Sequence, residues 1–322
     1  MFRVALLDDY QNVALGLADW SSLLPRAEVV AFADHIDHDE NLDALVARLE
    51  PFHCVMLMRE RTHFPRKLIE RLPNLRLIVS AAMWNIAIDL DAAAEHGVQV
   101  CGTNDLSNAT PELTFGLLLS LARQIHVEER AVREGRWQTT LGIAVRGKTL
   151  GIVGLGNIGS QVAALGQAFG MHTIAWSQNL DAARATAAGA ELVSKEDLFA
   201  RADFVTIHVK LSERTRGLVT ARELALMQAG AYLINTSRGP VVDEAALLEA
   251  LTERRIAGAA LDVFDHEPLA LDHPFRRLDN VLVSPHVGYV TRENYAVFYG
   301  DALEDIRAFL DGRVIRAMNR AL

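Results

Sequence analysis

Short apolar runs alternate with amphipathic segments along the first hundred residues. Runs of four or five mostly apolar residues separated by helical patterns are typical of a parallel sheet covered by helices. The predicted strands are Val4–Leu7, Val29–Phe32, Cys54–Met58, Leu77–Ser80 and Val98–Cys101, and helical patterns such as Asn41–Leu49 and Leu90–His96 lie between them. This part of the chain therefore predicts one α/β unit.

A longer helical pattern follows, from Pro111 to about Glu134. Thr110 and Pro111 favour a helix start, and Gly135 favours a helix end. Because the pattern lies between two series of strands, we predict one continuous helix that links one domain to the next.

A second series of strands begins at Thr149. Its predicted strands are Leu150–Val153, Thr173–Trp176, Phe204–Ile207, Tyr232–Ile234, Ala257–Leu261 and Val281–Val283, and a last helix is predicted from about Glu293 to Leu310. The same alternation indicates a second parallel sheet with helices on its faces.

Composition supports two domains and argues against several classes of partner. The chain has 322 residues, half of them hydrophobic, which is enough for two cores. Its net charge is −9 and its Lys and Arg residues form no cluster, so we expect no nucleic-acid partner. The apolar start is too short for a signal peptide, and no apolar run reaches the roughly 18 residues of a membrane helix. We expect a soluble, cytoplasmic protein without a membrane partner.

The two cysteines, Cys54 and Cys101, lie in apolar runs and lack the CxxC spacing of metal or redox sites. We predict reduced, buried thiols. Neither a disulfide nor a metal site is expected.

The second series opens with a glycine pattern, TLGIVGLGNIG, in which Gly154, Gly156 and Gly159 form GxGxxG between a strand and a helix. The first glycine permits a tight turn, the second lets a pyrophosphate approach the backbone, and the third lets helix and strand pack closely. The helix N-terminus then faces the anion. This context predicts a dinucleotide-binding site.

An acidic residue is expected about 20 positions further on, where it would bind the adenosine ribose. The chain has Ser177 there, followed by Gln178 and Asn179. A serine does not repel a 2′-phosphate, but no arginine stands beside it, since Arg184 is seven residues away. NAD and NADP therefore both stay open, with NAD slightly favoured.

Four polar side chains follow later strands of the same series: Arg238, Asp262, Glu267 and His286. Each alone has an ordinary structural explanation, such as a loop salt bridge, a turn former, a solvated acid or a surface or core histidine. Together they fall at the carboxyl ends of strands, where open parallel sheets bind ligands. A guanidinium suits the carboxylate of a 2-keto acid, and a carboxylate beside an imidazole orients it and favours its charged form.

The chain resembles the D-isomer-specific 2-hydroxyacid dehydrogenases from about Leu77 to its C-terminus. The resemblance rests on KTLGIVGLGNIG, NTSRGPVVDEAALLEAL, GAALDVFDHEPL and SPHVGY. It implies an α/β protein with two doubly wound parallel sheets, Rossmann-like and flavodoxin-like, and a cleft between the domains. Residues 1–103 and 290–322 would form the substrate-binding domain, and residues 104–289 the NAD(P)-binding domain.

The resemblance also implies an oxidoreductase that transfers a hydride between NAD(P)H and a small 2-keto acid such as glyoxylate, hydroxypyruvate or pyruvate. His286 would be the acid and base, Glu267 would orient it, and Arg238 would bind and polarise the substrate. The residues expected at the cofactor are Gly154, Leu155, Gly156, Asn157, Ile158, Gly159, Ser177, Gln178, Thr236 and Asp262. A homodimer is implied, with residues 111–134 and Trp137 near the partner; a Trp137 buried in its own domain is the alternative.

The substrate loop departs from the family pattern, because SAAMWNIAID stands where many relatives have a glycine-rich loop. Met83, Trp84 and Asn85 are expected to contact substrate together with Arg238 and His286, but the particular acid stays open. One alternative is a dinucleotide-binding, corepressor-like module without turnover. Relatives that oxidise formate or phosphite are another, although the formate enzymes have glutamine in place of Glu267.

Overall fold

The computed structural model of the chain describes residues 1–320. Two compact units are present: unit 1 combines Met1–Leu106 with the chain from Val290 onwards, and unit 2 is Ser107–Tyr289. In the described residues each unit contains one parallel sheet, of five strands in unit 1 and seven in unit 2. The predicted fold class, an α/β protein with two doubly wound parallel sheets, is confirmed.

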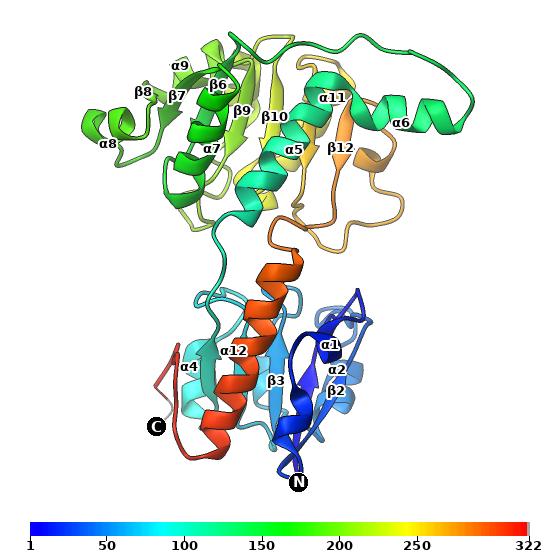
Figure 1. Ribbon diagram of the computed structural model, residues 1–322, viewed down its shortest axis with the longest axis vertical. Coiled ribbons are helices and arrows are strands. Elements are labelled where there is room, and N and C mark those ends of the chain that lie inside the picture. The colour runs from blue at the N-terminus through cyan, green and yellow to red at the C-terminus, as the bar shows by residue number, and fades with distance from the viewer. Residues whose placement is uncertain (321–322) are drawn as a thin grey trace. The chain divides into compact units, whose positions relative to one another are not determined.

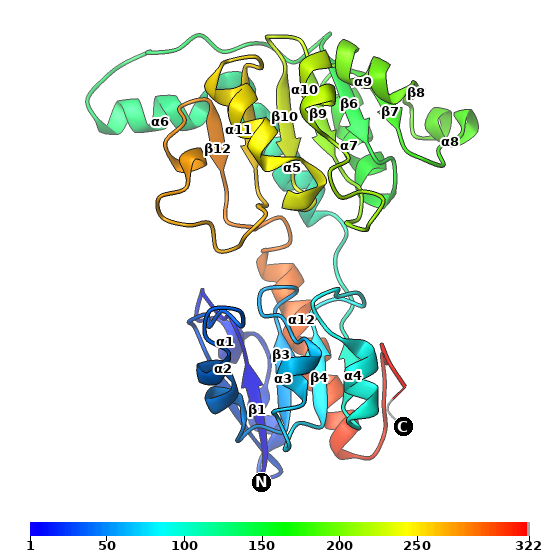
Figure 2. The same cartoon turned by 180° about the vertical axis from the view of Figure 1, so that it is seen from behind.

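The sheet of unit 1 has the strand order β2-β1-β3-β4-β5, the flavodoxin-like order. Figures 1 and 2 show α2, α3 and α4 on one face and α1 and α12 on the other. The strands are β1 Phe2–Leu6, β2 Ala27–Ala31, β3 Cys54–Leu57, β4 Leu77–Ser80 and β5 Gln99–Gly102, and the helices are α1 Ala14–Leu17, α2 Leu42–Leu49, α3 Arg66–Ile69, α4 Leu90–Glu95, α12 Arg292–Leu310 and a 3₁₀ turn, Trp20–Leu23.

The C-terminal segment protects the open edge of this sheet. Ala317 forms an antiparallel bridge with Cys101, and the Met318 N–H donates to Val100 O at 2.8 Å. The Asn319 side chain accepts from Val100 N and donates to Val98 O. Backbone groups that an edge strand would otherwise present for pairing are thus occupied.

The sheet of unit 2 has the order β12-β11-β10-β9-β6-β7-β8, the order of Rossmann-type sheets. Helices α5 and α7 cover one face, and α9, α10 and α11 cover the other (Figures 1 and 2). The strands are β6 Thr149–Val153, β7 His172–Trp176, β8 Glu191–Leu192, β9 Phe204–Ile207, β10 Tyr232–Asn235, β11 Gly258–Leu261 and β12 Val281–Val283, and the helices are α5 Ala109–Arg123, α6 Ile125–Arg133, α7 Asn157–Ala168, α8 Ala182–Ala187, α9 Lys195–Arg201, α10 Ala221–Leu226, α11 Glu244–Thr252 and two 3₁₀ turns, Gly239–Val241 and Pro274–Arg276.

The predicted single helix over Pro111–Glu134 is wrong, because the chain breaks at Gln124 into α5 and α6. Gln124 is left-handed (φ 54°) and its N–H closes the end of α5 onto Leu121 O. Neither glycine nor proline marks this break, so the pattern of residues did not reveal it. Helix α5 buries one side against the sheet, whereas α6 buries only Ala131.

The prediction for the cysteines is confirmed: Cys54 and Cys101 are buried, unbonded thiols. Burial raises the pKa of Cys101 to about 12, so the thiol is protonated at neutral pH. Among residues 1–320, no helix combines the length and apolar character needed to span a bilayer.

Candidate active site

The glycine pattern forms a tight loop between β6 and α7. Gly154 has φ 99°, and a Cβ there would lie 2.7 Å from His208 O. A Cβ on Gly159 would overlap the carbonyl oxygen of Gly154, whereas Gly156 faces open space. Helix α7 begins directly after Gly156, and no side chain caps its first N–H groups. The loop therefore fits a pyrophosphate group held by backbone N–H donors.

Ser177 lies directly after β7 and holds the glycine loop. Its Oγ accepts a hydrogen bond from Leu155 N at 2.8 Å. A hydroxyl that accepts one bond still has a proton to donate, so Ser177 can offer one donor to a ligand. Arg184 donates to Asn179 O at 3.2 Å, which keeps its guanidinium on the turn that follows Ser177.

His286 and Glu267 form a close pair at the carboxyl edge of this sheet. His286 Nδ1 lies 2.6 Å from Glu267 Oε2, with the two side chains 21 % and 33 % exposed. The other carboxylate oxygen accepts from Phe264 N at 2.9 Å, so both oxygens have fixed partners. Because Nδ1 is engaged, Nε2 is the ring nitrogen that can exchange a proton with a ligand.

Asp262 fixes the turn that carries His286. Its fully buried carboxylate accepts from Ser284 Oγ at 2.6 Å, Val287 N at 2.9 Å and Gly288 N at 2.8 Å. Burial raises the pKa of Asp262, and these hydrogen bonds oppose that effect. The carboxylate thus connects the end of β11 to the turn after β12.

Arg238 follows β10 in a loop that contacts the segment preceding Glu267. The buried Asn235 side chain donates to Arg238 O at 3.0 Å and accepts from Ser237 N at 3.0 Å. A Cβ on Gly239 would overlap the backbone of Phe264, so the two loops are in close contact. Arg238, Glu267 and His286 therefore follow three adjacent strands, β10, β11 and β12.

Thr236, which was expected at the cofactor, is buried beside α5. Its Oγ1 lies 2.9 Å from the Oγ1 of Thr114. This contact ties the end of β10 to the helix that covers the sheet.

The expected substrate loop belongs to unit 1 and follows β4. The Asn85 side chain is buried, donates to Arg59 O and Ser80 Oγ, and accepts from Ala87 N. Met83 and Trp84 are 46 % and 37 % exposed. Asn85 thus anchors the loop, while its two neighbours present apolar surface.

Three comparisons identify similar proteins. Residues 115–288 match the family model described as D-isomer specific 2-hydroxyacid dehydrogenase, NAD binding domain. A glyoxylate reductase of Aeropyrum pernix is 40 % identical over 257 residues, which cover 77 % of each chain. A D-3-phosphoglycerate dehydrogenase of Methanocaldococcus jannaschii is 39 % identical over 81 % of this chain but only 50 % of its own length. The crystal structure of a phosphoglycerate oxidoreductase from Vibrio cholerae superposes with a TM-score of 0.91 at 34 % identity, covering 97 % of this chain and 100 % of that one.

The chain belongs to the D-isomer-specific 2-hydroxyacid dehydrogenase family. The predicted family, the enzyme class and the NAD(P) cofactor are thereby confirmed. The matched NAD-binding region includes the glycine loop, Ser177 and the three strands that precede Arg238, Glu267 and His286.

Sequence reasoning missed one residue at the cofactor loop of this dehydrogenase, His208. It follows β9 directly, its carbonyl lies against Gly154, and its Nε2 lies 2.9 Å from Thr206 Oγ1. Burial lowers the pKa of His208 to about 3, so its imidazole is neutral at neutral pH. The residue after His208 is Val209, and its carbonyl oxygen accepts a hydrogen bond from the Ser237 hydroxyl. The position of His208 at a strand end was the signal that could have identified it.

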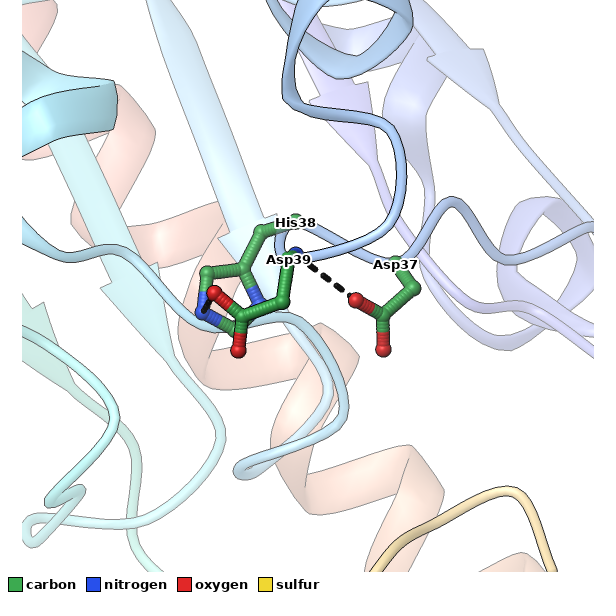
Figure 3. Close-up of side chains that lie close together, drawn as sticks. All are labelled: Asp37, His38 and Asp39. Atoms are coloured by element: carbon green, nitrogen blue, oxygen red, sulfur yellow. Dashed lines mark hydrogen bonds and ion pairs between the residues drawn. The ribbon is translucent and has the colours of Figure 1, made fainter.

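Another cluster in this 2-hydroxyacid dehydrogenase has the residue types of a metal site: Asp37, His38 and Asp39, just before α2 (Figure 3). Asp37 accepts from the Asp39 and Glu40 N–H groups, which closes a turn. Asp39 pairs with Lys67 at 2.8 Å and with His38 at 3.3 Å. These contacts explain why the side chains lie together, and no metal role is proposed for them.

Proposed function

We propose that this enzyme reduces a small 2-keto acid to a D-2-hydroxy acid with NADH or NADPH. The observation that carries the proposal is the 2.6 Å hydrogen bond between His286 and Glu267, on the same sheet as the glycine loop. Reduction of a carbonyl needs a proton donor for the oxygen that becomes negative, and an imidazole oriented by a carboxylate is suited to that task. The reduced nicotinamide supplies the hydride when it is bound.

His286 is the proposed acid in reduction and the base in the reverse direction. Glu267 holds Nδ1, which directs Nε2 to the carbonyl oxygen. The bond from Phe264 N keeps the carboxylate in place. In this way Glu267 orients the proposed proton donor.

Arg238 is the proposed site for the substrate carboxylate. A guanidinium can donate two parallel hydrogen bonds to a carboxylate, and its charge stabilises negative charge that develops on the carbonyl oxygen. The Asn235 side chain donates to the backbone carbonyl of Arg238 and so fixes the loop that carries it. Asp262, which supports the His286 turn, is proposed to lie beside the nicotinamide end of the cofactor.

The two units receive separate roles in this proposal. Residues 1–103 and 290–322 would bind substrate, with Met83, Trp84 and Asn85 at the loop after β4, and residues 104–289 would bind NAD(P). Asn85 contributes by anchoring that loop, since its side chain bonds within unit 1. Because one similar protein is a glyoxylate reductase, glyoxylate is the first substrate to test for reduction, followed by hydroxypyruvate and pyruvate, and 3-phosphoglycerate is tested in the oxidative direction.

The deciding experiment measures initial rates of NADH and NADPH oxidation by the purified protein on a panel of 2-keto acids, with the reverse reaction on D- and L-hydroxy acids. Turnover supports the proposal, and hydroxypyruvate or pyruvate should give the D-isomer, whereas the product from glyoxylate is achiral. Cofactor binding without turnover of any acid would overturn it and favour a binding module that uses the dinucleotide as a signal.

We propose that the enzyme discriminates only weakly between NAD and NADP, with NAD slightly preferred. Ser177 offers one neutral donor to the ribose and does not repel a 2′-phosphate. We therefore expect wild-type discrimination within roughly 1 to 3 kcal/mol, the range of one or two ordinary hydrogen bonds.

Two substitutions test this expectation through kcat/KM for both cofactors. Ser177→Asp keeps an acceptor for Leu155 N and adds charge, so it should disfavour NADPH. Gln178→Arg should do the opposite by offering a forked partner to the phosphate. An unchanged ratio in both variants would show that the end of β7 does not contact the ribose.

A homodimer is proposed through α6 and the segment that follows it. Figure 1 shows α6 extending away from the helical layers of unit 2. Trp137 and Leu141 are 78 % and 95 % exposed, and Ile125 and Val132 are also exposed. Apolar side chains in such numbers on one arm are typical of a protein interface. Analytical ultracentrifugation of the wild type and of the double variant Trp137→Ser/Leu141→Ser tests this proposal. A dimeric wild type and a monomeric double variant are expected.

A further inference from the structure

A loop of unit 2, residues 265–273, contains Glu267 and is closed at its base by a single side chain. Glu244 is the first residue of α11, on the other side of this base. Its Oε2 accepts from Asp265 N at 3.3 Å, and its Oε1 lies 3.1 Å from His273 Nε2. One carboxylate therefore binds both ends of the loop that carries the proposed orienting residue.

His273 is held so that it donates to Glu244. Its Nδ1 accepts from Phe275 N at 3.3 Å, which places the ring proton on Nε2. The ring also packs against the buried Phe275, with centroids 4.9 Å apart. The Glu244 and His273 side chains are 27 % and 18 % exposed, so much of this contact is shielded from water.

The rest of the loop depends on these two anchors. Arg276 donates to Ala270 O at 2.8 Å and Leu269 O at 2.6 Å, which shapes the distal half, and Leu271 at the tip is exposed. Within residues 1–320, the Glu267 carboxylate bonds to Phe264 N and to His286. The distance from Glu267 to its histidine thus depends on where Glu244 holds residues 265 and 273.

We propose that Glu244, together with His273, is a positioning residue that sets the Glu267–His286 pair. The inference rests on the proposed function, in which that pair transfers the proton. Glu244 does not touch the reacting groups in this scheme. Its removal loosens the loop, so Glu267 no longer keeps His286 oriented.

The expected effects follow from this chain of contacts. Glu244→Ala should lower kcat by roughly 10- to 100-fold, as misplacement of a reacting group by about an ångström does. In a plot of kcat for keto-acid reduction against pH, the high-pH limb should move to lower pH, because Glu267 is then held less firmly beside His286. NADH affinity should stay within about twofold, since the glycine loop lies on β6 and α7.

Two further variants separate position from charge. Charged or titratable groups around the loop base are Asp243, Asp265, His266 and Arg216, so removing Glu244 also changes the local field. His273→Ala breaks the same anchor and leaves the Glu244 charge in place; it should move the limb in the same direction. His273→Gln keeps an N–H donor at similar reach and should recover most of the rate.

Glu249→Ala is the matched control, because Glu249 is an exposed carboxylate of the same helix that pairs with Arg255. Its rate, pH limb and NADH affinity should equal those of wild type. Thermal melting of every variant reports folding.

Each result decides between the alternatives. A moved limb in both Glu244→Ala and His273→Ala, with recovery in His273→Gln, supports the inference. A lower melting temperature with an unmoved limb overturns it, because the pair would then serve stability alone; if Glu244→Ala does not fold, the two His273 variants decide. If Glu267→Gln moves the high-pH limb and neither Glu244→Ala nor His273→Ala does, only this inference fails. If Glu267→Gln leaves it unmoved, the proposed proton transfer fails as well.

Discussion

Each unit contains a carboxylate hydrogen-bonded to Nδ1 of a histidine, and the two pairs differ in their surroundings. In unit 1, Asp8 Oδ1 lies 2.9 Å from His35 Nδ1, with the side chains 1 % and 13 % exposed. In unit 2, Glu267 and His286 are 2.6 Å apart and both partly exposed. Both pairs follow the carboxyl ends of parallel strands, but the pair of unit 1 is more shielded from water than the pair of unit 2.

The difference lies in what else the carboxylate and the histidine contact. The second oxygen of Asp8 accepts from the buried Thr62 Oγ1 at 2.7 Å, so Asp8 joins the segments that follow β1, β2 and β3. The Glu267 pair is held by one backbone N–H, and its histidine lies on a turn supported by Asp262. A carboxylate–histidine pair by itself therefore does not identify an active site. The partial exposure of the Glu267–His286 pair and its place on the sheet that also carries the glycine loop make the distinction.

The largest expected effect tests that distinction directly. His286→Asn should lower the rate of keto-acid reduction by roughly 10²- to 10⁴-fold, the usual contribution of a general acid, with little change in cofactor affinity. His35→Asn should leave kcat close to wild type and lower the melting temperature instead. Steady-state rates, NADH titrations and thermal melts on both variants measure this, and equal loss of kcat in the two would remove the distinction.

The carboxylate partners give the next largest effect. Glu267→Gln should reduce turnover roughly 10- to 100-fold, since a hydrogen bond to a charged group contributes about 1.5 to 3 kcal/mol. It should also move the high-pH limb of the profile to lower pH. Asp8→Asn should weaken folding but leave that limb unmoved in the folded protein. A pH series of kcat for both variants shows whether the two carboxylates differ in this way.

The unit 1 pair should appear in the pH dependence of stability. The hydrogen bond that His35 donates to Asp8 raises the pKa of His35, and burial opposes this rise. The charges of Asp8 and Asp37 raise the pKa further, whereas Arg61 lowers it. The folded state therefore binds this proton more tightly than the unfolded state. The resulting stability is fully present below the unfolded value of about 6.5 and is lost as pH rises through the raised folded value.

His35→Gln measures that contribution. It should cost roughly 1 to 2 kcal/mol of unfolding free energy at pH 5.5, and less at pH 9, because this contribution is lost as the pH rises. Urea unfolding at the two pH values, with Leu15→Ala as an exposed control in the same unit, gives the comparison. A cost that does not change with pH would mean that His35 is neutral in the fold.

Local sequence signals explain which parts of the fold could be predicted. Apolar runs such as Leu77–Ser80 and Val281–Val283 matched the observed strands, and the glycine pattern placed the loop after β6. The two-residue β8 carries no comparable signal, since Glu191 and Leu192 are both exposed. The break at Gln124 was missed because a left-handed glutamine resembles any helical residue in a sequence pattern.

Partnerships between distant residues were harder to predict. Asp8 meets His35 across 27 positions and Glu244 meets His273 across 29, and neither pair lies in a recognisable motif of its own. Their proximity depends on which strand ends are adjacent, and only the folded sheet sets that. The sequence predicts a ligand contact for Ser177, whereas its bond to Leu155 N is visible only in the structure.

The smallest expected effect concerns left-handed residues at the two sheet edges. Ala82 in unit 1 has φ 73° and His286 in unit 2 has φ 53°. A non-glycine residue in the left-handed region destabilises the folded state by about 1 to 2 kcal/mol. Replacing it with glycine removes this strain, but a glycine loses more conformational entropy on folding, which costs roughly 0.5 to 1 kcal/mol. Ala82→Gly should therefore stabilise the protein by about 0.5 to 1 kcal/mol in urea unfolding. Ala81→Gly, at the buried neighbour without a positive φ, should destabilise it. Equal destabilisation by both would show that Ala82 is not strained.

At His286 the imidazole is needed for the proposed proton transfer. A glycine there would remove the backbone strain but would also abolish the reaction.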